Sequence, residues 1–161
     1  MRMNNQIEIH RDKYGIPHIE ASSESDGWFA MGYASASDRL WQMEWYRRRG
    51  TGRWSEVVGS DGLEADRLFR QFRLDYASQV DASDLSSETE LMFQCYADGV
   101  NAFVQQNELP PEYGLSEIDW EPWKIWHSIL VFKVRHVIMG KQLSKIARLE
   151  LLNRLGGEQM A

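Results

Sequence analysis

The chain has 161 residues, of which 43% are hydrophobic and 26% are charged, and its net charge is −6. This composition is typical of a globular protein, whereas the acidic balance argues against nucleic-acid binding and gives no reason to expect attraction to an anionic membrane. The single cysteine, Cys95, excludes an internal disulfide, and no apolar stretch reaches the length that spans a bilayer.

The first predicted element is a β-hairpin between residues 6 and 20. Ile7 and Ile9 alternate with polar residues, which is the period-two pattern of a strand. A turn is expected at residues 12–15. Pro17 disfavours a helical conformation in the residue before it, so the chain is expected to continue as a second strand.

Helix is predicted for most of the remaining chain. Gly50 ends one helical segment, and Ser87 with Glu90 has the spacing of a capping box at the start of another. A loop is expected at residues 108–114, and the last helix is expected to bend at Gly140. The predicted helical segments are 22–36, 38–49, 55–58, 63–74, 87–106 and 120–155.

These elements predict an α+β chain that is mostly helical and has an N-terminal β-hairpin. A two-stranded hairpin is only marginally stable by itself. The seven tryptophans also provide more large apolar surface than isolated helices of this length bury among themselves. We therefore expect a partner surface to cover part of the chain.

A search for catalytic motifs finds no nucleophile. No serine lies in Gly-x-Ser-x-Gly, no serine is followed by a lysine three residues later, and the chain has no His-Glu-x-x-His. The four histidines lack the spacing of metal ligands, and Cys95 lies among apolar residues at helical spacing, which favours buried packing over a catalytic role. We therefore predict no catalytic residue, no metal ligand and no cofactor on this chain.

The basic residues gather in one cluster, which consists of Arg47, Arg48, Arg49 and Arg53. The preferred interpretation of this cluster is a set of ion pairs with Asp38, Glu44 and Glu56. A patch that binds a carboxylate or a phosphate is the alternative.

A stripe in the last helix has two interpretations. Phe132, His136, Met139 and Leu143 are spaced i, i+4, i+7 and i+11, so they share one helix face. Periodicity alone favours a core face with one hydrogen-bonded histidine. The other interpretation is a pocket wall, because an aromatic ring, a flexible thioether and an imidazole suit an apolar ligand with one polar group.

Ordered blocks along nearly the whole chain resemble the signatures of the penicillin acylase family. They are residues 11–19 (RDKYGIPHI), 32–44 (GYASASDRLWQME), 52–59 (GRWSEVVG), 97–103 (ADGVNAF) and 120–123 (WEPW). Residues 109–115, 126–129 and 138–140 resemble the cephalosporin acylase branch of that family.

The resemblance implies an N-terminal-nucleophile hydrolase, whose precursor cuts itself into a small α chain and a large β chain that pack as one αββα sandwich. Residues 1–161 would then be a single α-chain unit rather than an independent domain. The nucleophile of this family is the serine that begins the β chain, and its own α-amine can act as general base. The implied partners are that β chain and a small-molecule amide, with no nucleic acid and no membrane.

The resemblance also implies which residues of this chain face the substrate. His136, Met139 and Gly140, together with Phe132 on weaker grounds, are expected to line the pocket for the acyl group. The calcium-binding glutamate of the classical family members corresponds to a position near Lys145, so no metal ligand is expected here.

The implied activity is removal of the acyl side chain from N-acylated substrates, for example β-lactams such as cephalosporins or penicillins. Two alternatives stay open: an acyl-homoserine lactone or acyl-peptide acylase of the same family, and a stand-alone, non-enzymatic helical binding module. The first residues have no apolar signal-peptide core, which predicts a cytoplasmic location, or a periplasmic one if a leader has been removed.

Overall fold

The computed structural model describes residues 7–140 and 142–155. Strands β1 (Glu8–Arg11) and β2 (Pro17–Glu20) pair antiparallel, with Ile9 opposite Ile19, so the predicted hairpin is confirmed. The carboxylate of Asp12 closes the turn, because its Oδ1 accepts hydrogen bonds from the backbone N–H groups of Tyr14 and Ile16 at 2.9 and 3.0 Å.

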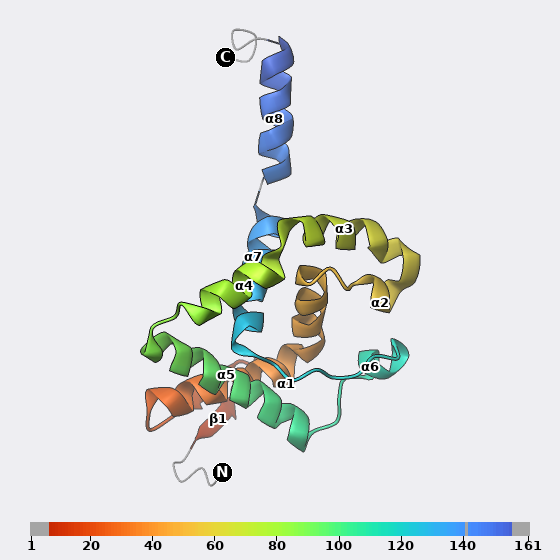
Figure 1. Ribbon diagram of the computed structural model, residues 1–161. Helices are drawn as coiled ribbons and strands as arrows, with labels where there is room; N and C mark the ends of the chain where they lie inside the picture. The colour runs from red at the N-terminus through yellow and green to blue at the C-terminus, as the bar shows by residue number, and fades with distance from the viewer. Residues whose placement is uncertain (1–6, 141, 156–161) are drawn as a thin grey trace.

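Helix α1 (Glu24–Gly50) unites the first two predicted helical segments. It begins where Ser23 accepts a hydrogen bond from the backbone N–H of Asp26, which is the usual role of an N-cap serine. Arg39 has non-helical backbone angles, φ −142° and ψ 20°, and this residue bends the helix (Figure 1). The hairpin is held against the bend by Arg11, whose guanidinium binds the carboxylate of Asp38 at 2.6 and 3.2 Å.

Helix α5 (Ser87–Gln106) crosses α1 at very close range. A Cβ atom at Gly32 of α1 would lie 2.0 Å from the carbonyl oxygen of Tyr96 in α5. In the opposite direction, a Cβ at Gly99 of α5 would lie 1.9 Å from the carbonyl oxygen of Phe29. Only glycine fits both positions, and the close contact places Ala97 and Val100 in the fully buried core.

Helix α7 (Ile125–Met139) packs against the end of α1. Leu130 and Val134 are fully buried, and a Cβ at Gly50 would overlap both of their side chains. The remaining elements are α2 (Ser55–Val58), the 3-10 helix η1 (Gly59–Gly62), α3 (Leu63–Phe72), α4 (Leu74–Ser83), α6 (Pro111–Leu115) and α8 (Gln142–Leu155).

The predicted bounds of three segments are wrong. The N-cap of α5 is Ser86 rather than Ser87, and it accepts from the backbone N–H of Thr89. The predicted helix at 63–74 ends at Phe72, because Arg73 takes a left-handed conformation with φ 50° before α4 begins. The expected loop at 108–114 contains α6, since Pro111 fits the first turn of a helix, where no backbone N–H is needed.

The last predicted helix begins five residues later than expected. Residues 120–124 are not helical, and α7 begins at Ile125. The side chain of Asn101 holds this segment, because it accepts from the backbone N–H of Trp123 at 2.7 Å and donates to its carbonyl at 2.9 Å. A contact with α5 therefore overrides the local preference of the Trp120–Trp123 segment for a helix start.

The bend predicted at Gly140 is confirmed. Gly140 has extended backbone angles, φ −71° and ψ 134°, and beyond it α8 projects away from the other helices (Figure 1). No helix among the described residues combines the length and hydropathy required to cross a bilayer. The side chain of Leu143, the fourth member of the predicted stripe, lies outside the part of the chain that the structure describes.

Candidate functional site

The outer face of α7 carries the residues that the sequence singled out. The inner face of this helix holds Leu130 and Val134 in the core, whereas Phe132 is 67% exposed and Met139 is 70% exposed. Large apolar side chains at such exposure do not form a core. Phe132 and Met139 are therefore not part of the core that the described residues form, and their exposure is compatible with the pocket-wall interpretation.

The four predicted residues lie around one open depression of about 550 Å³, which we call the α7 hollow. It is lined by Ser128, Val131, Phe132, Arg135, His136, Met139 and Gly140. The rings of Phe132 and His136 lie 5.6 Å apart at an angle of 42°. The guanidinium of Arg135 lies 3.9 Å from the sulfur of Met139. Apolar side chains together with a guanidinium and an imidazole suit an apolar ligand that carries one polar or anionic group.

Arg135 and Ser128 are lining residues that the sequence reasoning missed. Ser128, Phe132, Arg135 and Met139 follow the spacing i, i+4, i+7 and i+11, so a second stripe would have identified them. The apolar periodicity of α7 indicates only one of its two overlapping stripes.

A second cavity of about 260 Å³, the apolar pocket, shares Ser128 and Val131 with the α7 hollow. Its other walls come from Trp123, before α7, and from α1 and α5, which supply Trp28, Met31, Met92 and Phe93 among others. The hydroxyl of Ser128 accepts a hydrogen bond from Nε1 of Trp123 at 3.0 Å. The pocket is thus a hydrophobic recess beside the α7 hollow, with methionine side chains that adapt to different shapes.

His127 lies in the first turn of α7, on its buried face, and has a structural role. Its side chain is only 3% exposed, and Nδ1 accepts a hydrogen bond from the backbone N–H of Lys124 at 3.0 Å. Burial first, and then the positive charges of Arg47 and Lys124, together lower the pKa of His127 to about 3, so the ring is neutral at neutral pH. The rings of Trp123 and Trp126 pack against it at 5.2 and 4.0 Å.

A buried ion cluster stabilises the bend between α1 and the segment that follows it. Glu44 is fully buried and binds the guanidinium groups of Arg47 and Arg48. Arg48 also binds Glu56, so the predicted ion pairs with Glu44 and Glu56 are confirmed. The predicted pair with Asp38 is wrong, because that carboxylate binds Arg11 of the hairpin instead.

Arg53 extends this cluster to the loop before α7. Its guanidinium binds Glu56 at 2.8 and 3.0 Å and Glu121 at 2.7 Å, and it holds the pKa of both carboxyl groups below the usual value. Arg49 instead lies over the rings of Trp45 and Phe69 at 5.0 and 5.4 Å. Arg47, Arg48 and Arg53 thus form ion pairs with carboxylates of the same chain, which disfavours a phosphate-binding patch.

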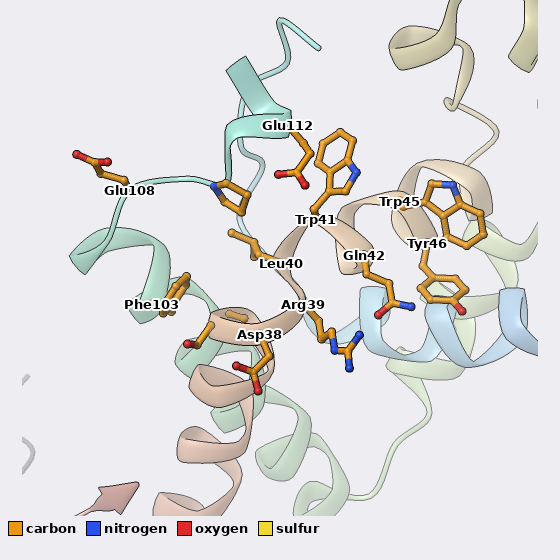
Figure 2. Close-up of a pocket in the computed structure, with 13 residues that line it drawn as sticks. Asp38, Arg39, Leu40, Trp41, Gln42, Trp45, Tyr46, Phe103, Glu108 and Glu112 are labelled. Carbon is orange, nitrogen blue, oxygen red and sulfur yellow. The ribbon is translucent and has the colours of Figure 1, made fainter. Parts of the chain in front are cut away.

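A third depression, of about 800 Å³, lies at the bend of α1 (Figure 2). Figure 2 shows that its walls come from α1 on both sides of Arg39, from Phe103 near the end of α5, and from the segment of Glu108 and Glu112 at α6. Ser37 also lines it, but the hydroxyl accepts a hydrogen bond from Arg11, a group that cannot act as a base.

The contacts of the four histidines are with carboxylates, the backbone and an aromatic ring, and not with a nucleophilic side chain. His10 binds the carboxylate of Glu8 at 2.9 Å, and His18 binds that of Asp12 at 3.4 Å. His127 accepts a hydrogen bond from the backbone, and His136 packs against the ring of Phe132. Cys95 is half-buried rather than buried. In residues 7–140 and 142–155, no group of three or more His, Cys, Asp or Glu side chains is arranged to hold a metal ion.

Comparison with known sequences matches the penicillin amidase family over residues 6–161. The penicillin acylase 2 proenzyme of Pseudomonas sp. strain SE83 is 40% identical over 93% of this chain and 20% of that protein. The acyl-homoserine lactone acylase QuiP of Pseudomonas aeruginosa is 35% identical over 96% of this chain and 19% of that protein. The chain therefore spans about one fifth of the length of these curated relatives.

Among solved structures, a thermostable penicillin G acylase from Alcaligenes faecalis has a similar fold. The TM-score is 0.76 at 28% identity, and the match covers 96% of this chain and 87% of that chain. Together with the observed hairpin and helices, this similarity confirms the predicted fold class.

Proposed function

The chain belongs to the penicillin amidase family, and from this premise we propose that it is the α chain of an amide hydrolase made as a self-cleaving precursor. In this proposal the nucleophilic serine begins a large β chain from the same precursor, and the α chain completes the fold. The term proenzyme in the name of one relative supports the precursor. The match to 87% of one chain in a solved penicillin G acylase supports a separate chain of this length.

The α7 hollow is the observation that carries the proposed role of this chain. Phe132 and Met139 are largely exposed on a helix whose opposite face is fixed in the core. Exposed apolar side chains around a depression are typical of a binding surface. We assign the hollow to the acyl part of the substrate, with His136 and Arg135 positioned to contact a polar or anionic end of that group.

In this proposal the β chain supplies the nucleophile and its base, and the α chain binds the acyl group. The α-amine of a terminal serine has a lower pKa than a lysine side chain, so it can accept the hydroxyl proton near neutral pH. Attack on the amide carbonyl gives an acyl-enzyme and releases the amine, and water then releases the acid. The α chain holds the acyl group and excludes water from its apolar part, which favours acyl groups that fill the hollow.

The leading substrate class is N-acylated β-lactams, and acyl-homoserine lactones are a second candidate. The apolar pocket favours the second class, because an alkyl chain that enters the α7 hollow beside Ser128 can continue between Met92 and Trp28. The 35% identity to an acyl-homoserine lactone acylase supports the same candidate.

Hydrolysis of a substrate panel by the complete enzyme tests both proposals. The panel contains phenylacetyl, glutaryl and long-chain acyl amides and an acyl-homoserine lactone. Met139→Ala is expected to change kcat/KM by about tenfold for bulky acyl groups, since lost apolar contact in a pocket typically has this magnitude. His136→Ala is expected to act mainly on the glutaryl substrate.

Ile138→Ala is the matched control, because Ile138 is exposed on the same helix turn but does not line the hollow. If Met139→Ala and His136→Ala leave the ranking of acyl groups as it is in the control, the assignment of the α7 hollow is wrong. A preference for long acyl chains that disappears on Met92→Trp would identify the apolar pocket as their site.

A further inference from the structure

Ser128 is a helical serine whose hydroxyl hydrogen has no acceptor among the described residues. Its oxygen accepts a hydrogen bond from Nε1 of Trp123 at 3.0 Å. By contrast, the hydroxyl of Ser78 in α4 donates to the carbonyl of Leu74 at 2.6 Å, which is a common bond for a serine inside a helix. The side chain of Ser128 therefore retains one donor that the described part of the chain does not use.

This hydroxyl lies where two cavities meet. Ser128 lines both the α7 hollow and the apolar pocket, and Val131 is the other residue that they share. The described residues that line the apolar pocket include one other hydroxyl, that of Tyr96, and it is hydrogen-bonded to Ser35. Ser128 thus brings a free hydroxyl hydrogen to the boundary between the hollow and a recess with mainly apolar and aromatic walls.

Trp123 fixes the position of the Ser128 oxygen. Trp123 is only 3% exposed, so its indole N–H is buried and depends on Ser128 as its acceptor. Asn101 of α5 binds both backbone groups of Trp123, at 2.7 and 2.9 Å, and the guanidinium of Arg47 lies 5.7 Å from its ring. Because a buried donor without an acceptor lowers stability, rotation of the Ser128 side chain away from Trp123 is disfavoured.

A fixed hydroxyl with a free hydrogen recognises an acceptor, which in an acyl group is a ketone or ether oxygen along the chain. The indole N–H polarises the hydroxyl of Ser128 and strengthens its donation. Arg135 lies seven residues further along α7, which is roughly 10 Å along the helix axis, so the two side chains contact different parts of a ligand. The cation suits an anionic end, whereas the hydroxyl suits a neutral oxygen inside an apolar chain.

We propose that Ser128 is a specificity residue that donates a hydrogen bond to a neutral oxygen within the acyl chain, and that Trp123 is its positioning residue. This inference rests on the proposed function, because it requires an acyl group in the α7 hollow. It deepens that function by selecting, among chains of one length, those with a ketone or ether oxygen at the depth of Ser128. An unsubstituted chain contacts the same apolar walls but leaves the hydroxyl hydrogen unpaired.

The test compares oxo-substituted and plain acyl chains on the complete enzyme. The substrates are a decanoyl amide and its 3-oxo, 5-oxo and 7-oxo forms with the same amine. The measured quantity is the ratio of kcat/KM for each oxo substrate to that for the plain one, which does not depend on the concentration of active enzyme. For at least one oxo position, Ser128→Ala is expected to lower this ratio about fivefold, the effect of one lost hydrogen bond, and to change kcat/KM for the plain substrate less than about twofold.

Three further variants separate the hydroxyl from its surroundings. Ser128→Thr keeps the hydroxyl, and Ser78→Ala removes one that lines neither cavity, so both are expected to keep the ratio of the unmodified enzyme. Trp123→Phe removes the indole N–H and is expected to lower the ratio when Ser128 is present. In the Ser128→Ala background it should have no further effect on the ratio, because the two residues act as a unit.

An unchanged ratio in Ser128→Ala at every oxo position would overturn the role of Ser128. Hydrolysis of short acyl amides but of none of the decanoyl substrates would also overturn it, because no chain would then reach this hydroxyl. An equal effect of Trp123→Phe in both backgrounds would refute its positioning role. Failure of the proposed function gives a different result, since the complete enzyme would then hydrolyse no acyl amide of either panel.

Discussion

Replacing His127 by asparagine is expected to remove a defined part of the pH dependence of stability. The imidazole is buried and neutral, and its Nδ1 accepts a hydrogen bond from the backbone N–H of Lys124. The side-chain oxygen of asparagine occupies nearly the same position as Nδ1, so it can accept that bond. Asparagine does not titrate, and the packing lost against the two tryptophans is independent of pH.

The magnitude follows from the difference in proton affinity between the folded and unfolded states. Burial first, and then the charges of Arg47 and Lys124, lower the pKa of His127 from 6.5 to about 3. Because the unfolded chain binds the proton more tightly, stability is complete above pH 6.5 and is lost as the pH falls toward 3. Each pH unit in this window corresponds to about 1.4 kcal/mol, so about 2 kcal/mol is lost between pH 7 and pH 5.

The assay is denaturant unfolding of the assembled protein at pH 7 and pH 5, with and without His127→Asn. The variant is expected to be less stable at pH 7, but its loss of free energy between the two pH values should be about 2 kcal/mol smaller than that of the unmodified protein. All other titrating groups are common to the two proteins and cancel in the comparison. Equal pH dependence in both would refute the neutral, buried state of this histidine.

Two further substitutions test the packing of α1. Gly32→Ala is expected to destabilise the assembled protein by roughly 2–4 kcal/mol, because the added Cβ would lie 2.0 Å from the carbonyl oxygen of Tyr96. Gly27→Ala is the control, because its Cβ meets nothing closer than 4.0 Å, and its denaturation midpoint should stay unchanged or rise. Glu44→Gln is expected to lower the free energy of unfolding by about 3–5 kcal/mol, since it leaves two buried guanidinium groups without their shared anion. Thermal unfolding should show a smaller loss of stability for Glu56→Gln, because the side chain of Glu56 is 45% exposed. Equal losses of stability in the two variants would contradict the central role of Glu44.

The elements that sequence reasoning predicted well are those whose signals are local. The hairpin has alternating residues and a short turn, and the two ends of α1 are marked by a serine N-cap and by Gly50, so each signal lies at the position that it determines. The ion pairs of Glu44 were also predictable, because Arg47 and Arg48 lie three and four residues further along the same helix.

The features that sequence reasoning missed depend on contacts between distant segments. The start of α7 is set by Asn101, which lies 22 residues before the backbone groups that it binds. The apolar pocket is assembled from three helices and Trp123 of the segment before α7, so no single stretch of sequence contains its pattern. Asp38 has nearby arginines in sequence, yet the folded hairpin brings Arg11 to it from 27 residues away.

The two faces of α7 have a consequence for how acylases of this kind diverge. Leu130 and Val134 are fully buried, whereas Phe132 and Met139 are largely exposed on the same helix. Under the proposed function, substitutions on the exposed face change the surface offered to the acyl group without opening a cavity in the core. Such a helix can accumulate specificity-altering mutations at little risk to folding, which makes it a natural point of evolutionary divergence and a favourable target for directed evolution.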